Sequence, residues 1–340
     1  MTEWSKRVRS GLNLTVQYAP GRSAAAALAD HLRIVEAVRD AGWDSVFVAQ
    51  HYLSEGMAHL QPLPLLGLLS SVAGDMRLGV GICLLALQNP VDAAEAYATA
   101  DVISGGRLVF GAGLGYRDVE YDAFGAVAGS RVERFTRNLD LVTRLWQGEA
   151  VDADLPWCRL DGARLTTLPV QRPRPPVWLA ANSDKAVRRA ARLGDAWMIN
   201  PHAAMTTVER QMELFRATRA EAGLPPAVDV PLMREVVCAP DRATAVARAR
   251  RHLADKYAVY RRWGQDSVLP SDDRFDAEPT ELSRDRFVIG DPQDCLLTLR
   301  DWIKRVDATE IVLRVHWAGA PVEEALESVE LLSTEVLPYL

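Results

Sequence analysis

Cysteine and histidine are scarce in this 340-residue sequence, and neither residue type is clustered. The four cysteines, Cys83, Cys158, Cys238 and Cys295, lack the spacing of a metal site. The six histidines form no HxxxH pair. We therefore expect reduced thiols in a cytoplasmic protein, and no metal held by its side chains.

Long apolar runs and an excess of positive charge are also missing. No stretch of about 18 apolar residues exists that could cross a membrane, and residues 1–10 are not followed by an apolar segment of the signal-peptide type. The net charge of −6 argues against a nucleic-acid-binding surface. With 49% hydrophobic and 25% charged residues, the composition is that of a soluble globular protein.

What the sequence does contain is a repeated unit, in which a short apolar strand is followed by polar residues and then by a helix. Eight such units of buried, non-alternating strands favour a (β/α)₈ TIM barrel, an α/β fold, with a doubly wound sheet as the alternative. The predicted strands lie at residues 12–17, 45–49, 76–82, 108–110, 177–181, 196–199, 230–238 and 310–315.

The chain is longer than the roughly 250 residues of a typical barrel. We place the excess in three insertions: residues 114–130 after the fourth strand, residues 149–176 before the fifth strand, and residues 264–286 after the seventh βα unit. The whole chain, residues 1–340, is expected to form one domain. The third insertion is a candidate lid over the site.

The carboxyl ends of barrel strands share one rim, where active sites are found. Predicted strand ends carry Gln50 and His51, and also Tyr116 and Arg117 after the glycine-rich residues 111–115. This set has no pair of carboxylates for glycoside hydrolysis. The glycines follow a GxGxG spacing rather than the dinucleotide-binding pattern, so a floor beside a flat ring explains them better.

His51 is the most informative single residue, because a neutral imidazole just past a barrel strand can donate a hydrogen bond or act as acid and base. A histidine tied to a structural neighbour is the alternative. Asn182 and Ser183 precede a helix, where Ser183 is a good N-cap and the free amides offer an anion site. Arg131, which opens another helix, is a matching cation or else a solvated surface arginine.

Several motifs together make the chain similar to the bacterial luciferase-like, flavin-dependent monooxygenases. They include AGWDSVFVAQH at 41–51, SGGRLVFGAGLGYRDVEY at 104–121, PVQRPRPPVW at 169–178 and AARLGDAW at 190–197. The resemblance covers roughly residues 12–338. It implies a TIM barrel that binds reduced FMN or, in a sister branch, the deazaflavin coenzyme F-420.

The resemblance also implies roles for individual residues. His51 falls on the catalytic histidine, and Arg131 with Asn182 and Ser183 fall on the phosphate site. A non-proline cis peptide beneath the flavin ring would fall near Gly81 and Ile82. The other implied contacts are the cofactor contact of Gly113 and a substrate pocket of Gln50, Tyr116, Arg117, Trp197 and Trp317.

The sequence departs from the luciferases at two places. Gln50 stands where they carry a glutamate, so we expect His51 to lack a charged partner there. Gly113 and Leu114 stand where they carry a cysteine and an arginine, so the second phosphate contact is lost or passes to Arg117 or Arg131.

These expectations describe a two-component monooxygenase that takes reduced FMN from a flavin reductase, uses O₂ and oxidises a small, apolar organic substrate. One alternative is hydride transfer with coenzyme F-420, which needs cationic groups for a polyglutamate tail. Another is a non-catalytic flavin-binding partner subunit. The resemblance further implies a homodimer formed through the second and third helices.

Overall fold

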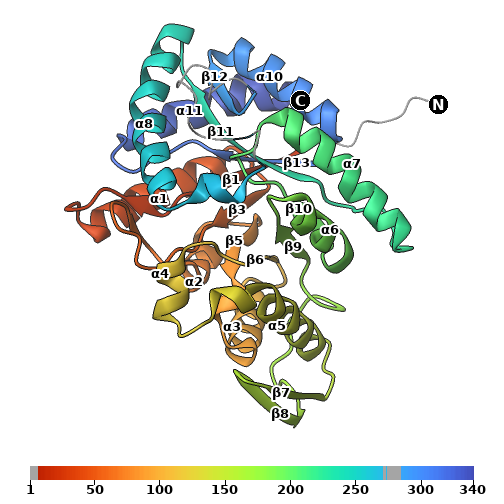
Figure 1. Ribbon diagram of the computed structural model, residues 1–340. Coiled ribbons are helices and arrows are strands. Elements are labelled where there is room, and N and C mark those ends of the chain that lie inside the picture. Colours follow the sequence, from red (N-terminus) through yellow and green to blue (C-terminus); the bar gives the residue numbers. More distant parts are fainter. Residues whose placement is uncertain (1–6, 271–272, 274–284) are drawn as a thin grey trace.

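The computed structural model describes residues 7–270, 273 and 285–340. Its centre is a barrel of parallel strands surrounded by helices (Figure 1). The barrel strands are β1 (Arg9–Leu14), β3 (Ser45–Val48), β5 (Arg77–Leu84), β6 (Leu108–Gly113), β9 (Val177–Ala180), β10 (Ala196–Met198), β11 (Pro231–Cys238) and β13 (Glu310–Arg314).

The order around the barrel is β10-β9-β6-β5-β3-β1-β13-β11. The barrel closes between β10 and β11, where Ile199 pairs with Leu232 in parallel. All eight predicted strands are found in this ring. The predicted (β/α)₈ barrel is therefore confirmed, and the doubly wound alternative is wrong.

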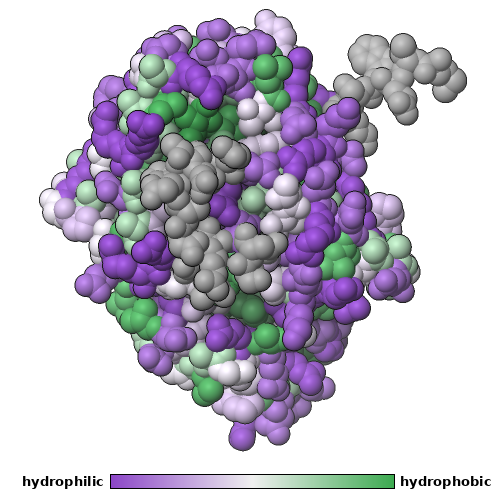
Figure 2. Space-filling view, turned by 45° about the horizontal axis from the view of Figure 1, so that its top comes forward, coloured by the Kyte–Doolittle hydropathy of each residue, from purple (hydrophilic) through white to green (hydrophobic). Residues whose placement is uncertain are grey.

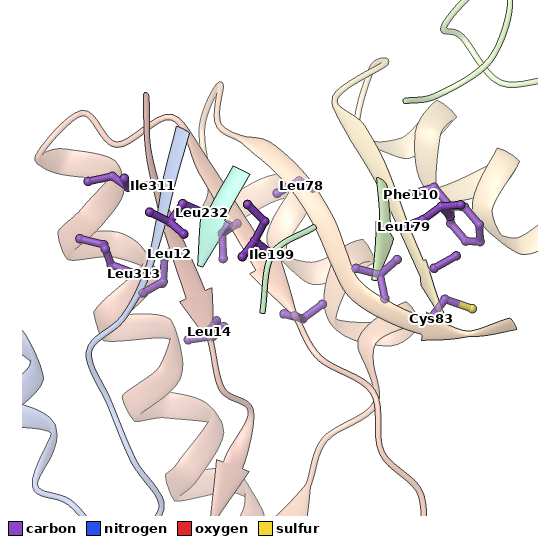
Figure 3. Packing of buried hydrophobic residues seen from close by; sticks show 14 of the residues in the cluster. Leu12, Leu14, Leu78, Cys83, Phe110, Leu179, Ile199, Leu232, Ile311 and Leu313 are labelled. Atoms are coloured by element: carbon purple, nitrogen blue, oxygen red, sulfur yellow. The ribbon is translucent and has the colours of Figure 1, made fainter. Parts of the chain in front are cut away.

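Each barrel strand is buried on both faces. Successive residues alternate between the barrel interior and the layer of helices around it. Leu12, Leu78, Phe110 and Leu179 belong to the cluster that packs against the helices, part of which is seen in Figure 3. Their neighbours fill the interior: Phe47, Val109, Trp178, Ala196, Met198, Met233 and Val312. Burial on both faces explains why the strands appear in the sequence as short, continuous apolar runs.

The helices begin at the carboxyl ends of the strands and lead back to the amino ends, so their first turns lie on the same rim as the strand ends. Side chains of Ser23, Asn89, Ser183, Asp241 and Asp291 accept hydrogen bonds from the first turns. The helices are α1 (Ala24–Asp40), α2 (Pro62–Val72), α3 (Pro90–Ile103), α4 (Asp118–Ala123), α5 (Arg131–Trp146), α6 (Asp184–Leu193), α7 (Met205–Glu221), α8 (Arg242–Arg262), α10 (Pro292–Val306) and α11 (Val322–Leu331).

Several short elements were not predicted. The first insertion contains α4, and the second contains a hairpin of β7 (Val151–Leu155) and β8 (Cys158–Ala163), seen at the bottom of Figure 1. A ninth parallel strand, β12 (Phe287–Gly290), pairs with the end of β11. All three are too short to show a clear helical or strand period in the sequence. The remaining short elements are β2 (Gln17–Tyr18), β4 (Ala58–His59) and the single turns η1 (Leu85–Leu87), η2 (Ala128–Ser130), η3 (Gln265–Val268), η4 (Leu332–Val336) and η5 (Leu337–Tyr339).

The third insertion lies between α8 and β12, as expected from the sequence. Residues 271–272 and 274–284, on which the predicted lid depends, lie outside the described residues. Figure 2 shows one face of the molecule, on which hydrophilic side chains dominate and hydrophobic ones form separate patches. Among the described helices, none combines the length and the apolar character needed to span a bilayer.

A cluster of charges closes the amino end of the barrel. The Glu310 side chain has no exposed surface, accepts a hydrogen bond from Arg9 Nε at 3.2 Å and forms an ion pair with Arg77. Ser45 Oγ donates to Glu310 Oε1 at 2.5 Å, and Arg9 also pairs with Asp229. Two arginines therefore face two carboxylates, and the charges at the amino end of the barrel, called the floor below, are balanced.

We predict that Glu310→Gln lowers the free energy of unfolding by about 2 kcal/mol, measured by urea denaturation. The substitution leaves Arg9 and Arg77 to share Asp229, and the partial exposure of both arginines keeps the loss below that of a fully buried pair. The control Glu335→Gln, at an exposed position, should change stability by less than about 0.5 kcal/mol. Equal effects of the two substitutions would contradict the structural role given to this cluster.

Candidate active site at the barrel mouth

His51 lies at the carboxyl end of the barrel, three residues beyond β3. Its side chain is 14% exposed. Three aromatic rings surround the imidazole, with centroid distances of 5.5 Å to His59, 6.2 Å to Tyr116 and 5.4 Å to Trp263. These rings come from β4, from the loop after β6 and from the residue after α8. Segments distant in the sequence thus form one aromatic enclosure around the His51 imidazole.

The charged partner of His51 is Glu120 of α4. Its carboxylate lies 3.3 Å from His51 Nδ1 and accepts hydrogen bonds from the Tyr52 backbone N–H at 2.9 Å and from Arg117 Nη1 at 3.1 Å. As expected from Gln50, the residue before His51 supplies no charge, but His51 does have a charged partner elsewhere. The partner comes from the insertion after the fourth barrel strand instead of the position before the histidine.

Glu120 is fully buried and yet favours its ionised form. Burial acts to raise the pKa of its carboxyl group, but the hydrogen bond and charge of His51, the Tyr52 amide and the charge of Arg117 together hold that pKa below its usual value. A carboxylate beside Nδ1 favours the tautomer with the proton on Nδ1. Nε2 is then the nitrogen that can exchange a proton or a hydrogen bond with a ligand.

Arg117 is buried, with only 5% of its surface exposed, and it binds the backbone next to His51. It donates to the backbone oxygens of Tyr52 at 2.6 Å and Leu53 at 3.0 Å, and its guanidinium lies 4.3 Å from the ring centroid of Trp263. Because these contacts use its donors, we do not assign Arg117 a direct contact with a substrate or a phosphate, the two roles expected from the sequence. Its donors are used to fix the loop that carries His51.

Two other predicted pocket residues adjoin His51. Gln50 is buried, accepts a hydrogen bond from the Leu84 N–H at 2.8 Å and donates to Tyr52 Oη at 2.8 Å, so it joins the His51 loop to the end of β5. The hydroxyl of Tyr116 is buried and has no hydrogen-bond partner among the described residues. Burial raises the pKa of this phenol, which keeps it protonated and able to donate to a ligand.

The peptide bond between Gly81 and Ile82 is cis, as the family resemblance implied. The glycines of the next strand make room for this segment. A side chain at Gly111 would collide with the Val80 carbonyl oxygen, and one at Gly113 would collide with the side chain of Ile82. The observed role of Gly113 is thus to accommodate β5. A direct contact between Gly113 and a cofactor stays a proposal.

The predicted phosphate residues lie on two helix starts of the same rim. Ser183 is exposed and caps α6 through a long hydrogen bond of 3.4 Å from the Ala186 N–H, and Asn182 accepts one from Asn200. Arg131 opens α5, donates from Nε to the Ala128 carbonyl at 2.9 Å and lies 5.7 Å from the Tyr121 ring centroid. The hydrogen bonds described for these residues do not reach His51, Glu120 or Arg117, so the phosphate site stays a prediction.

Trp197 faces the helices instead of the barrel interior, whereas the pocket role of Trp317 stays a prediction. Trp197 points outward from β10, donates from Nε1 to the Ala181 carbonyl at 3.0 Å and packs on Phe215 of α7. Trp317 is stacked on His252 of α8, 6.0 Å between ring centroids. Alternation along β10 places Ala196 and Met198 inside the barrel, which forces Trp197 to the helix side.

The sequence reasoning missed Glu120, His59 and Trp263 as neighbours of His51. One signal pointed to Glu120, because Arg117 and Glu120 are three residues apart, the spacing of an ion pair on one helical turn. Nothing local to His59 or Trp263 indicates their position. Their contacts with His51 depend on how the segments after β3 and α8 cross the barrel mouth.

Comparison with known proteins gives a consistent result. The family model described as luciferase-like monooxygenase matches residues 8–309. The solved structure of the monooxygenase RslO1 from Streptomyces bottropensis superposes with a TM-score of 0.85, at 23% identity over 97% of this chain and 99% of that one. The oxygenating constituent of 3,6-diketocamphane monooxygenase from Pseudomonas putida, solved in complex with FMN, superposes with a TM-score of 0.81. The two are 17% identical, and the match covers 98% of this chain and 99% of that one.

Among curated proteins, the chain is similar to the phthiodiolone/phenolphthiodiolone dimycocerosates ketoreductase of Mycobacterium tuberculosis (strain ATCC 25618 / H37Rv). The two are 27% identical over 200 residues, which is 58% of this chain and 52% of that protein. The chain thus spans about half the length of the first curated relatives it matches. The solved structures, at such low identity, support the fold alone.

We predict that Glu120→Gln lowers the free energy of unfolding by about 2–4 kcal/mol at pH 7, because the buried Arg117 loses its carboxylate partner. Since folding lowers the pKa of Glu120, its contribution is complete above the usual value of 4.5 and is lost as the pH falls through the lower folded value. Urea denaturation from pH 7 to pH 3 measures both effects.

The control for this prediction is Asp118→Asn, an exposed position in the first turn of the same helix. This substitution should lower the free energy of unfolding by less than about 0.5 kcal/mol. A gap between wild type and Glu120→Gln that already closes above pH 4.5 would contradict the assignment of an ionised, buried carboxylate.

Proposed function

This chain belongs to the luciferase-like monooxygenase family, and we propose that it is a flavin-dependent monooxygenase that uses reduced FMN and O₂. The observation that carries the proposal is the pairing of His51 with the buried, ionised Glu120 at the barrel mouth, inside an aromatic enclosure. We further propose that a separate flavin reductase supplies the reduced FMN and that the substrate is a small organic molecule.

The residues at the mouth fit a flat cofactor. Gly81, Ile82 and Ala180 are partly exposed although the strands around them are buried, so small groups at the ends of β5 and β9 form an open floor. Gly113 lies between them, since a side chain there would reach both Ile82 and Ala180. Asn182, Ser183 and Arg131 would hold the FMN phosphate through helix amides and a guanidinium.

When bound, reduced FMN supplies the electrons that activate O₂. The protein supplies a proton at a defined atom. Glu120 holds His51 with Nε2 available to the pocket, so the imidazole can donate a hydrogen bond to an oxygen atom or take its proton. The rings of His59, Tyr116 and Trp263 would exclude water from the same space, which keeps the reacting groups out of contact with solvent.

One specific observation favours FMN over coenzyme F-420. The long acidic tail of F-420 needs cations at the rim, and the sequence offers Arg117 and Arg131 for this. Arg117 is buried and bonded to Tyr52, Leu53 and Glu120, so it is not available to such a tail. The intact pair of His51 and Glu120 also favours an enzyme over a non-catalytic flavin-binding subunit.

We also propose a homodimer formed through α2 and α3. Leu68 on α2 and Val102 and Ile103 on α3 are among the exposed large apolar side chains. A subunit interface would remove this apolar surface from water.

The proposed function is tested by cofactor titration and by oxygen labelling. Reduced FMN, titrated anaerobically, should bind more tightly than reduced F-420. Addition of ¹⁸O₂ with a panel of ketones, aldehydes and phenols should place ¹⁸O in one product class. Tight F-420 binding with ketone reduction and no ¹⁸O incorporation would establish the hydride-transfer alternative instead.

For the substrate found in that screen, His51→Ala should lower kcat by about 10²–10⁴-fold, the usual contribution of a general acid or base. FMN affinity should stay within about threefold, because His51 is not assigned to the cofactor. Full turnover by His51→Ala would remove the role given to this residue.

We predict that Arg131→Gln and Ser183→Ala each weaken FMN binding about tenfold, since each removes a hydrogen bond to the phosphate. The affinity of each variant for riboflavin, which lacks the phosphate, should fall by less than about twofold. Fluorescence titration measures both ligands, and Arg137→Gln, an exposed position on α5, is the control. Parallel losses for FMN and riboflavin would show that these residues do not contact phosphate.

A further inference from the structure

The barrel mouth is divided into two chemically different halves. The ends of β5, β6 and β9 carry small, neutral residues. The ends of β11 and β13 carry Glu235 and Arg314, which point inward because each lies two residues beyond an interior side chain, Met233 and Val312. Glu235 is 0% and Arg314 2% exposed. The proposed function makes no use of this charged half.

A third charged side chain comes from α8. Lys256 is 3% exposed and forms an ion pair with Glu235. Its ammonium group also lies 4.7 Å from the ring centroids of both Tyr257 and Tyr260. Burial, followed by the charge of Arg314, lowers the pKa of Lys256 well below its usual range. The local environment therefore works against positive charge.

This cluster sets two basic side chains, Arg314 and Lys256, against the single carboxylate of Glu235. Arg314 Nη1 lies 3.8 Å from Glu235 Oε1, beyond hydrogen-bond range. The guanidinium donates instead to neutral oxygens, those of Gln17 at 3.0 Å, of His316 at 3.2 Å and of the Tyr260 hydroxyl. Within the described part of the chain, no second carboxylate is paired with Arg314 or Lys256. When Lys256 is protonated, it shares the Glu235 carboxylate with Arg314, and an anionic ligand would add the missing negative charge.

A purely structural cluster would be balanced, because an uncompensated buried charge is costly. The floor of the same barrel shows this, since Arg9 and Arg77 face both Glu310 and Asp229. The mouth cluster has one carboxylate for two basic groups and is linked to His51 through a chain of contacts. Gln17 Nε2 donates to Tyr260 Oη at 3.0 Å, Tyr260 stacks on Trp263, and Trp263 packs on His51.

We propose that Arg314 and Lys256 form an anion subsite of the active site, which binds an anionic oxygen, such as a carboxylate, phenolate or enolate, of the molecule held at the mouth. Glu235 holds the two cations in place and competes with the ligand for them. The proposal rests on the proposed function, because it names the chemistry of the ligand in that same site. The anionic oxygen belongs to the organic substrate or to the reduced flavin ring.

Benzoate is a suitable probe, with benzamide as its neutral counterpart. Calorimetric titration should show benzoate binding to the wild type at least tenfold more tightly than benzamide. Arg314→Gln and Lys256→Met should each weaken the binding of benzoate at least tenfold and leave the binding of benzamide unchanged. Arg250→Gln, an exposed position on α8, is the control and should change neither.

Glu235→Gln should change benzoate affinity in the opposite direction, and it keeps both basic side chains. It should tighten benzoate binding, because the internal competitor loses its charge. This variant keeps the proposal testable even if one of the cation variants fails to fold, which its thermal melting curve reports. Absence of benzoate binding to the wild type, or benzoate affinities that are unchanged by all three substitutions, would overturn the proposal.

Titrations with and without FMN assign the source of the anionic oxygen. Benzoate that still binds to the FMN-saturated protein reports a substrate subsite. Benzoate that is displaced by reduced FMN, together with a tenfold loss of reduced FMN affinity in Arg314→Gln, assigns the subsite to the flavin ring. Benzoate binding needs no flavin, so a failure of the monooxygenase proposal would leave this result readable by itself.

Discussion

The position of the proposed catalytic histidine depends on one buried carboxylate. Glu120 has no exposed surface, and His51, the Tyr52 amide and Arg117 all converge on it. An ionised group in the interior is stable only when it is compensated by charges and hydrogen bonds. The loop after β3 and the insertion after β6 must therefore adopt the arrangement that supplies these partners. That arrangement orients His51 and lays Arg117 against Trp263.

The two ends of the barrel use charge in different ways. At the floor, arginines and carboxylates are equal in number and tie the amino ends of the strands together. At the mouth, small residues leave an open surface on one side, and Glu235 with its two cations occupies the other. Between the ends lies a dry layer of apolar side chains around Phe47 and Trp178. The balanced ion pairs thus stabilise the amino end of the barrel, and the proposed binding site lies at the carboxyl end, as in other barrels of this kind.

Much of the fold could be predicted because its signals are local. The barrel strands are buried on both faces and appear as short apolar runs, and helices such as α5 and α6 carry regular apolar spacing and caps. The elements that were missed, α4, β12 and the β7–β8 hairpin, have four to six residues each and exist because neighbouring structure pairs with them or covers them. Such context has no counterpart in a short stretch of sequence.

The sequence by itself determined the barrel and the three insertions, which follow from residue type and order along the chain. Through the resemblance of its motifs to a known family, the sequence also indicated the place of His51 and the position of the cis peptide. Only the tertiary structure decided that Glu120 is the partner of His51, that Arg117 is buried, and that Trp197 faces the helices. The physical reason is that burial, the compensation of charge and the direction of a side chain across a strand depend on segments that meet only when the barrel closes.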